Sequence, residues 1–315
     1  MSEPTVVPHA APLSAPVPGL DPVAVARWRG RPRQASPWLH EEVGRRMAER
    51  LDWIRQAPTS WIDWSPLLGG LQAHRSVAQR YPQAAAWLAG EQVAAALAAL
   101  APPAQAPWAF WRRRAGPSAA AAARAWDGQA PGAGLLWANM ALHLVPDPQA
   151  QLAHWRDMLA VDGFLMFSCL GPDTGLELRA LYAQLGWPAP APPWVDMHDL
   201  GDMLVQAGMA EPVMDMERFT LTYATAERLL QDLRETGRNF SAQRPATLRG
   251  RRHRQALLAA IERHWPRTPD GQLGFTVEVI YGHAFRPLPR VPLAAATTVS
   301  EAEMRQMLRQ GVPRP

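Results

Sequence analysis

The sequence predicts an α/β protein with a seven-stranded, mostly parallel sheet, helices on both faces and an inserted helical lid. Three observations lead to this prediction. Apolar runs of strand length alternate with segments of helical periodicity from Trp61 to Phe285. A chain of 315 residues is long enough to bury a large core. No apolar run reaches the roughly 20 residues that cross a membrane, so no membrane-spanning helix is predicted.

The clearest unit lies in the middle of the chain. Leu135–Ala138 reads as a strand, and a helix with apolar residues at helical spacing follows between Ala150 and Leu159. Asp162-Gly163 marks a turn, and Phe164–Cys169 is a continuous apolar run of strand length. Strand, crossover helix and strand form a parallel unit, which places the polar loop Leu170–Thr174 at the ligand-binding edge of the sheet.

Similar patterns predict the remaining elements. Further strands are expected at Trp61–Trp64, Ala84–Leu88 and Trp108–Trp111, and two closing strands, one of them antiparallel, at Pro212–Tyr223 and Phe275–Phe285. Helices are expected at Trp38–Gln56, Leu71–Tyr81, Glu91–Leu100, Ser118–Trp126, Gly175–Leu185 and Met197–Ala207, with two more between Thr225 and Trp265.

Composition divides the chain into a central domain and two tails. Residues 1–30 are Ala/Pro-rich and predict a disordered tail without the basic start of a signal peptide, as in a cytoplasmic protein. Residues 31–287 form the expected domain, with the helical lid inserted at 225–270. Residues 288–315 read as a flexible C-terminal tail in which Ser300–Arg309 is a possible short helix.

Charge and cysteine content exclude several classes of protein. The single cysteine, Cys169, lies in an apolar run, which excludes a disulfide framework and favours a buried, inert thiol. All basic residues except histidine are arginines, and the net charge is only +4. The arginines are not interleaved with an aromatic platform, so nucleic-acid binding is not favoured.

Four stretches of the sequence match signatures of one enzyme family. Asn139 follows the fourth expected strand, and Gly171-Pro172-Asp173-Thr174 follows the fifth. Asp196–Asp202 (DMHDLGD) and Glu278–His283 (EVIYGH) lie downstream. The chain thus resembles, over roughly residues 38–286, the malonyl-acyl-carrier-protein O-methyltransferases of biotin synthesis, which are class I S-adenosylmethionine-dependent methyltransferases. The resemblance implies a Rossmann-like fold, S-adenosylmethionine as cofactor, an acyl carrier protein as partner and methylation of the free malonyl carboxylate.

The resemblance also implies which residues hold the cofactor, namely Asp63, Gly69, Gly70, Glu91 and Asn139. In the family, an acid and a glycine-rich turn follow the first strand because the cofactor approaches bare backbone. An acid after the second strand binds the ribose. Glu91 lies one or two positions late for this contact, and its alternative role is to stabilise a helix dipole.

The turn after the first strand departs from the family pattern. Trp64, Ser65 and Pro66 replace the early glycines, and proline has no N–H to donate. A Trp64 side chain pointing into this space would occupy the position of the cofactor's methionine moiety. Arg112–Arg114, which can only donate, follow the third expected strand where the family has an acid. The sequence therefore predicts weak or absent binding of S-adenosylmethionine, and a plain strand-to-helix turn is the alternative interpretation.

On the substrate side, the candidate residues are Thr174, His198, Tyr281 and His283. The alternatives are a capping role for His198 and core packing for Tyr281 and His283. In the lid, Arg249, Arg251 and Arg252 suit an acidic carrier protein, its phosphopantetheine phosphate or the malonyl carboxylate. A solvated arginine face is the alternative.

Two functional hypotheses follow from these patterns. The first is a methyltransferase that acts on a malonyl thioester; methyl transfer to an ionised carboxylate needs little acid–base chemistry, so no catalytic side chain or metal site is expected. The second is a protein of the methyltransferase fold that has lost cofactor binding and acts as a binding or regulatory partner. The substrate side favours the first hypothesis and the cofactor side favours the second.

Overall fold

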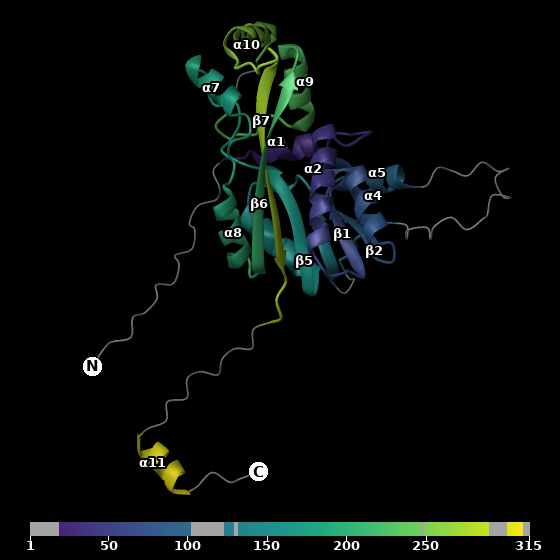
Figure 1. Ribbon diagram of the computed structural model, residues 1–315, viewed down its shortest axis with the longest axis vertical. Helices are drawn as coiled ribbons and strands as arrows, with labels where there is room; N and C mark the ends of the chain where they lie inside the picture. The colour runs from purple at the N-terminus through teal and green to yellow at the C-terminus, as the bar shows by residue number, and fades with distance from the viewer. Residues whose placement is uncertain (1–18, 102–122, 129–131, 247–248, 290–300, 311–315) are drawn as a thin grey trace, which may run out of the picture.

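The computed structural model describes residues 19–101, 123–128, 132–246, 249–289 and 301–310 (Figure 1). The strand expected at Trp108–Trp111 and the arginines Arg112–Arg114 lie outside the described residues. Within them, no helix is long and apolar enough to cross a membrane.

Seven strands form one sheet in the order β3-β2-β1-β4-β5-β7-β6. β7 is antiparallel to both of its neighbours, and the other strand pairs are parallel. The predicted seven-stranded, mostly parallel sheet is therefore confirmed. The strands are β1 (Ser60–Trp64), β2 (Ala85–Ala89), β3 (Arg124–Ala125), β4 (Ala133–Ala138), β5 (Leu159–Leu170), β6 (Ala210–Tyr223) and β7 (Leu273–Phe285).

Helices cover both faces of the sheet and gather at one end of it, where α7, α9 and α10 lie (Figure 1). The α-helices are α1 (Pro22–Arg29), α2 (Trp38–Arg50), α3 (Pro66–Gly69), α4 (Leu71–Arg80), α5 (Val93–Leu100), α6 (Pro148–Met158), α7 (Leu176–Gln184), α8 (Met197–Gln206), α9 (Ala226–Thr236), α10 (Arg251–His264) and α11 (Glu301–Gln310). Two 3-10 helices, η1 (Leu51–Trp53) and η3 (Leu142–Leu144), complete the described elements.

The core consists of two apolar layers, one on each face of the sheet. Neighbouring side chains of a strand point to opposite faces, so Trp61 packs in one layer and Ile62 in the other. The first layer contains Val43 and Met47 of α2. The second contains Trp155 of α6, together with residues of α8. The continuous apolar runs of the central strands are explained by this burial on both faces.

The structure corrects two local expectations. Arg124–Ala125 is the edge strand β3, although the end of a helix was expected there. The backbone N–H of Trp126 donates to the carbonyl of Leu88 over 2.8 Å, so pairing with β2 overrides the helix preference of an alanine-rich segment. The second correction is α1, which lies in the segment expected to be a tail and buries Val25 and Trp28.

Candidate functional site

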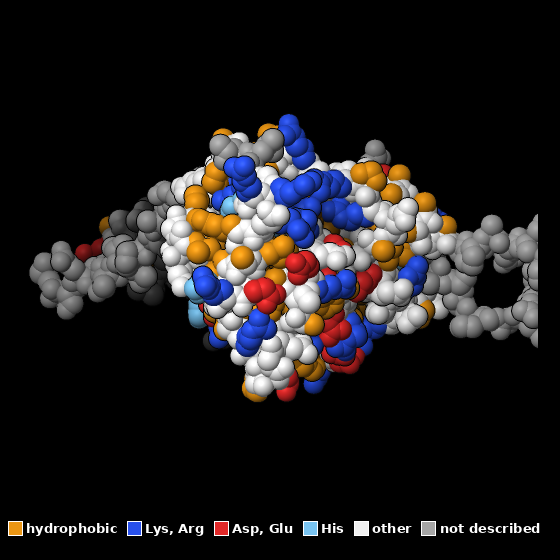
Figure 2. All heavy atoms as spheres, turned by 90° about the horizontal axis from the view of Figure 1, so that it is seen from above, with side chains coloured by type: hydrophobic (Ala, Val, Ile, Leu, Met, Phe, Trp, Pro, Cys, Tyr) orange, Lys and Arg blue, Asp and Glu red, His pale blue; other side chains and the backbone are white. Residues whose placement is uncertain are grey.

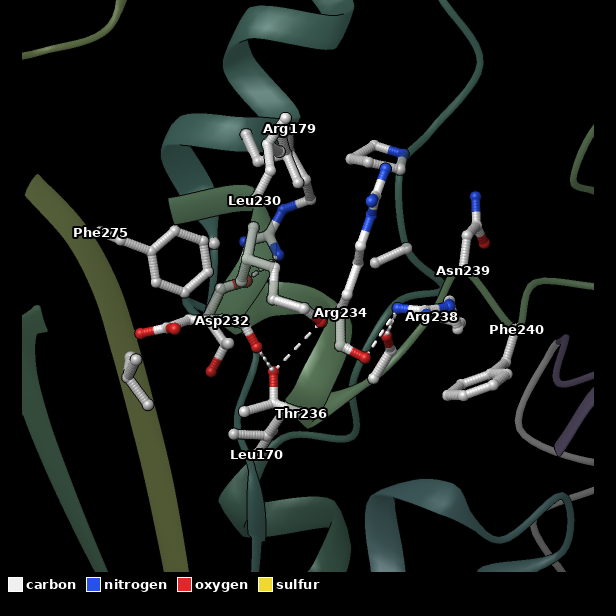
Figure 3. Close-up of a pocket in the computed structure, with 18 of the residues that line it drawn as sticks. Leu170, Arg179, Leu230, Asp232, Arg234, Thr236, Arg238, Asn239, Phe240 and Phe275 are labelled. Carbon is white, nitrogen blue, oxygen red and sulfur yellow. Dashed lines mark hydrogen bonds between the residues drawn. The ribbon is translucent and has the colours of Figure 1, made fainter. Parts of the chain in front are cut away.

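A cavity of about 400 Å³ lies between the lid helices α9 and α10 and the carboxyl end of β5. Apolar side chains form most of its wall, and Figure 3 shows Leu170, Leu230 and Phe275 around it. His143 and Trp194 also line it. His143 Nδ1 and Trp194 Nε1 are buried without a hydrogen-bond partner among the described residues. We call this space the lid cavity.

At the floor of the lid cavity, the motif Gly171–Thr174 is hydrogen-bonded to the motif Glu278–His283. The hydroxyl of Thr174 donates to the carbonyl of Glu278 over 2.9 Å and accepts from its N–H over 3.1 Å. Gly171 lies against the Glu278 side chain, since a Cβ at Gly171 would lie 2.3 Å from Glu278 Oε1. Thr174 thus lines the cavity as expected, while its hydroxyl holds the loop after β5 against β7.

Five arginines line the lid cavity: Arg179, Arg234, Arg238, Arg249 and Arg254. In the described part of the chain, none of the five forms an ion pair with a carboxylate. Burial and the nearby charges of Arg31 and Arg234 lower the pKa of Arg238. Viewed onto the lid, arginine side chains gather in a broad patch (Figure 2). The mouth of the cavity is therefore positively charged.

The sequence identified only part of this arginine set. Arg249 lines the cavity, where its guanidinium lies 5.6 Å from the centre of the Tyr182 ring. Arg251 and Arg252 are exposed at the start of α10 and do not line the cavity. Arg179 and Arg234 were missed because α7 and α9 lie far apart in the sequence and only the packing of the lid brings them together.

His198, Tyr281 and His283 lie away from the lid cavity. His198 is exposed, and its ring Nδ1 and backbone N lie 2.8 Å from Asp196 Oδ1, as in the capping interpretation. Tyr281 is buried beneath the guanidinium of Arg50, and burial raises the pKa of its phenol. His283 packs beside Phe285. Because β7 is antiparallel, its later residues lie toward the edge of the sheet opposite the cavity.

The residues expected to hold the cofactor lie beside the lid cavity, at the carboxyl ends of β1, β2 and β4, which we call the cofactor edge. Asp63 is buried, and its Oδ2 accepts a hydrogen bond from His74 Nδ1 over 2.8 Å. Burial raises the pKa of Asp63, and the hydrogen bond from His74 opposes this rise. The carboxylate therefore ties β1 to α4.

Glu91 is engaged on both carboxylate oxygens. Arg29 Nη1 lies 2.9 Å from Oε1, and the Ser65 hydroxyl donates to Oε2. Ser65 adopts a left-handed conformation (φ 56°) and fills the space beside Gly90, where a Cβ would lie 2.3 Å from its Oγ. The Trp64 ring packs edge-on against Trp155, with centroids 5.7 Å apart, and its Cε2 would lie 3.3 Å from a Cβ at Gly90.

Asn139, Gly69 and Gly70 are also in contact with other protein groups. Asn139 Nδ2 donates to the carbonyls of His40, over 2.7 Å, and Gly69, and its Oδ1 accepts from Ser168 over 2.7 Å. Gly70 (φ 131°) approaches Glu41, which caps α4. The structure brings the expected cofactor residues together, and their polar groups bind one another or neighbouring segments.

No family model matches the chain. Its curated relatives are named malonyl-[acyl-carrier protein] O-methyltransferase. The protein of Laribacter hongkongensis is 38% identical over 257 residues, which cover 80% of this chain and 84% of the relative. That of Gallionella capsiferriformans is 38% identical over 262 residues, with 82% and 87% covered. This chain belongs to the malonyl-acyl-carrier-protein O-methyltransferase family. A putative methyltransferase from Bacillus halodurans aligns with 12% identity, a TM-score of 0.46 and 77% of this chain covered, too distantly to add to this assignment.

Family membership makes this a class I methyltransferase-like protein and indicates S-adenosylmethionine as the cofactor. The side chains at the cofactor edge do not fit that molecule. Both oxygens of Glu91, which would receive the ribose, are occupied by Arg29 and Ser65. Both Nδ2 hydrogens of Asn139 and its Oδ1 are hydrogen-bonded to protein groups. Trp64 and Ser65, two of the residues that the sequence predicted to disfavour the cofactor, make contacts with other protein groups.

Proposed function

We propose that the lid cavity binds the malonyl thioester of an acyl carrier protein. The observation that carries this proposal is a mostly apolar cavity of about 400 Å³ whose mouth holds arginines without carboxylate partners among the described residues. An extended, thioester-linked arm with a carboxylate at its tip and a phosphate at its base matches this distribution of apolar and cationic groups. The named substrate of the curated relatives supports the same choice.

The inner wall suits the polar end of such an acyl group. His143 Nδ1 and Trp194 Nε1 are buried without partners in the described part of the protein, and an unsatisfied buried polar group costs about 1–3 kcal/mol. Burial, with the nearby charges of His40 and Arg29, holds the pKa of His143 well below its usual value, so its ring is neutral. A carboxylate or thioester oxygen would give the Trp194 N–H an acceptor.

The outer rim suits an acidic carrier. Arg234, Arg238 and Arg254 line both the cavity and a neighbouring surface groove on the lid. Arginine donates in a planar fork that matches phosphate oxygens, and an acidic partner would be attracted by this positive charge. Arg251 and Arg252, exposed on the first turn of α10, extend the same positive surface.

The test is to titrate the full chain with malonyl-loaded acyl carrier protein and to follow binding by calorimetry. Leu230→Trp should fill the cavity and abolish binding, because Leu230 lines it from α9. Val205→Trp is the matched control, since Val205 is 57% exposed on α8, away from the cavity. Equal affinity of the two variants would refute the proposal.

Methyl transfer to the malonyl carboxylate is the second candidate function, and it is favoured by identity to the curated relatives across four fifths of the chain. Its test is the transfer of a labelled methyl group from S-adenosylmethionine to malonyl-acyl carrier protein. Label in the product would establish the enzyme, whereas binding of the carrier without transfer would support a non-catalytic role. The cytoplasmic location expected from the sequence stays a prediction.

A further inference from the structure

Helix α1 lies across the end of the sheet, between the lid helices and the strands (Figure 1). At its start, the N–H of Asp21 donates to the carbonyl of Phe240 over 2.7 Å, and the Asp21 carboxylate pairs with Arg244 over 2.6 Å. At its end, Arg29 pairs with Glu91 over 2.9 Å. The helix is therefore fixed to the lid segment at one end and to the turn after β2 at the other.

The apolar face of α1 packs against the cofactor edge. Val25 and Trp28 form a buried cluster with Leu68, Leu144 and Phe240. Leu68 belongs to the turn after β1, and Leu144 follows β4. Both turns hold residues expected to bind the cofactor, namely Gly69 and Gly70 after β1 and Asn139 after β4. Side chains of α1 thus pack against both of them.

At the C-terminal end of α1, Arg29 forms an ion pair with Glu91, the acid expected to bind the ribose. The side chain of Arg29 is 12% exposed, and burial lowers its pKa while the charge of Glu91 opposes this. The side chain of Glu91 is 35% exposed, so the pair is only partly buried. Removing Glu91 would leave the more buried Arg29 without its charge partner. A ribose hydroxyl that bound Glu91 would have to share its carboxylate with Arg29 and Ser65.

We infer that α1 replaces S-adenosylmethionine in this chain, as a built-in occupant of the cofactor edge, and that the chain binds neither this molecule nor S-adenosylhomocysteine. The inference goes beyond carrier binding and does not depend on it. The same helix also has a structural role at the lid cavity, because Phe240 and Leu144 line that cavity and Trp28 packs behind them. The helix therefore supports a wall of the lid cavity, and this support needs no bound cofactor.

The first test is calorimetric titration of the full chain with S-adenosylmethionine and with S-adenosylhomocysteine. We expect no saturable binding up to millimolar ligand. Saturable binding at micromolar concentration would overturn the inference. The outcome is separate from that of carrier binding, because the carrier titration reports on the lid cavity and this one on the cofactor edge.

The second test measures hydrogen exchange of the backbone amides of α1, with and without S-adenosylmethionine. We expect slow exchange that the ligand does not change; faster exchange on adding ligand would mean that the cofactor displaces the helix and would overturn the inference. Arg29→Ala should speed exchange across α1, whereas Arg27→Ala, an exposed arginine of the same helix, should not. Equal exchange rates in the two variants would show that Arg29 does not anchor α1. Cofactor binding gained by Arg29→Ala alone would support it directly.

Discussion

The lid cavity and the cofactor edge lie side by side along one edge of the same sheet, and they differ in how their polar groups are used. In the lid cavity, arginines of α7, α9 and α10 face the space without carboxylate partners among the described residues. At the cofactor edge, Asp63, Glu91 and Asn139 bind His74, Arg29 and Gly69. The arginines around the lid cavity remain available to an anionic ligand. At the cofactor edge, by contrast, the polar side chains are bound by other residues of the chain, beneath helix α1.

The largest expected effect tests how firmly the cofactor edge is filled. Trp28 is 3% exposed and packs edge-on against Phe240, with centroids 5.6 Å apart. Trp28→Ala should lower the free energy of unfolding by about 3–5 kcal/mol, the usual cost of removing a buried aromatic side chain. Trp38→Ala is the matched control, because Trp38 lines the lid cavity and is 41% exposed. Urea denaturation measures both, and similar losses would contradict the contrast between the two regions.

The next largest effect is a pH dependence of the stability, which arises from His40 between the lid cavity and the cofactor edge. His40 is fully buried, and its Nδ1–H donates to the carbonyl of Leu68 over 2.8 Å. Burial lowers the pKa of His40 from 6.5 to about 4. The unfolded chain therefore binds this proton more readily, so stability should fall as the pH drops from about 6.5 towards 4. The loss from this group should approach about 3 kcal/mol, since each pKa unit corresponds to about 1.4 kcal/mol.

Denaturation midpoints at several pH values between about 7 and 4 check this prediction. His40→Gln keeps a donor for Leu68 and removes the titration, so the acid loss should become smaller. His264→Gln, an exposed histidine at the end of α10, should leave the pH dependence as in the wild type. An unchanged slope in His40→Gln would show that other groups, such as the buried His143, dominate it.

A smaller effect concerns the arginines at the mouth of the lid cavity. Exposed charges contribute about 0.2–1 kcal/mol each, so replacing both Arg234 and Arg238 by Ala should weaken carrier binding by about 2- to 30-fold. Affinity should also become less sensitive to salt, because fewer charges remain to be screened. Titrations at low and moderate ionic strength measure both quantities.

Replacing Arg251 and Arg252 tests whether carrier binding depends on the arginines that line the cavity or on the overall positive charge of the lid. Both are exposed and neither lines the cavity, so their double replacement by Ala should weaken carrier binding less than that of Arg234 and Arg238. Arg263→Ala, at the far end of α10, should leave affinity unchanged. If Arg251 and Arg252 prove the more important pair, the carrier docks on the outside of α10.

The sheet was predictable from sequence because its signal is local. Strands such as Phe164–Cys169 are continuous apolar runs, and burial on both faces of a parallel sheet requires this pattern. Helix α1 was not predicted, since its burial depends on Leu68, Leu144 and Phe240, which come from three distant segments. Its local sequence shows only Asp21 at the N-cap and Pro22 after it, a helix-start signal within an Ala/Pro-rich stretch.

The site was only partly predictable for the same reason. Of the candidate residues that the motifs supplied, Thr174 and Arg249 line the cavity. They did not separate residues that line a cavity from residues that hold the fold. Tyr281 lies in a family motif, yet the antiparallel direction of β7 places it in the core. Which residues of a strand reach the cavity, and how the lid packs, are tertiary properties that residue spacing does not encode.

The smallest expected effect on carrier binding is that of Thr174, and it tests whether the hydroxyl of this residue serves the fold or the ligand. Its hydroxyl makes two hydrogen bonds with the backbone of Glu278, and a typical hydrogen bond contributes about 0.5–1.5 kcal/mol. Thr174→Val keeps the shape and removes both bonds, so the free energy of unfolding should fall by about 1–3 kcal/mol, while Thr174→Ser should cost less. Affinity of the folded Val variant for the malonyl carrier should stay within about twofold of the wild type, because the hydroxyl is already engaged by protein. A Val variant of unchanged stability but reduced affinity would instead assign the hydroxyl to the ligand, and the floor of the lid cavity would then be a binding surface.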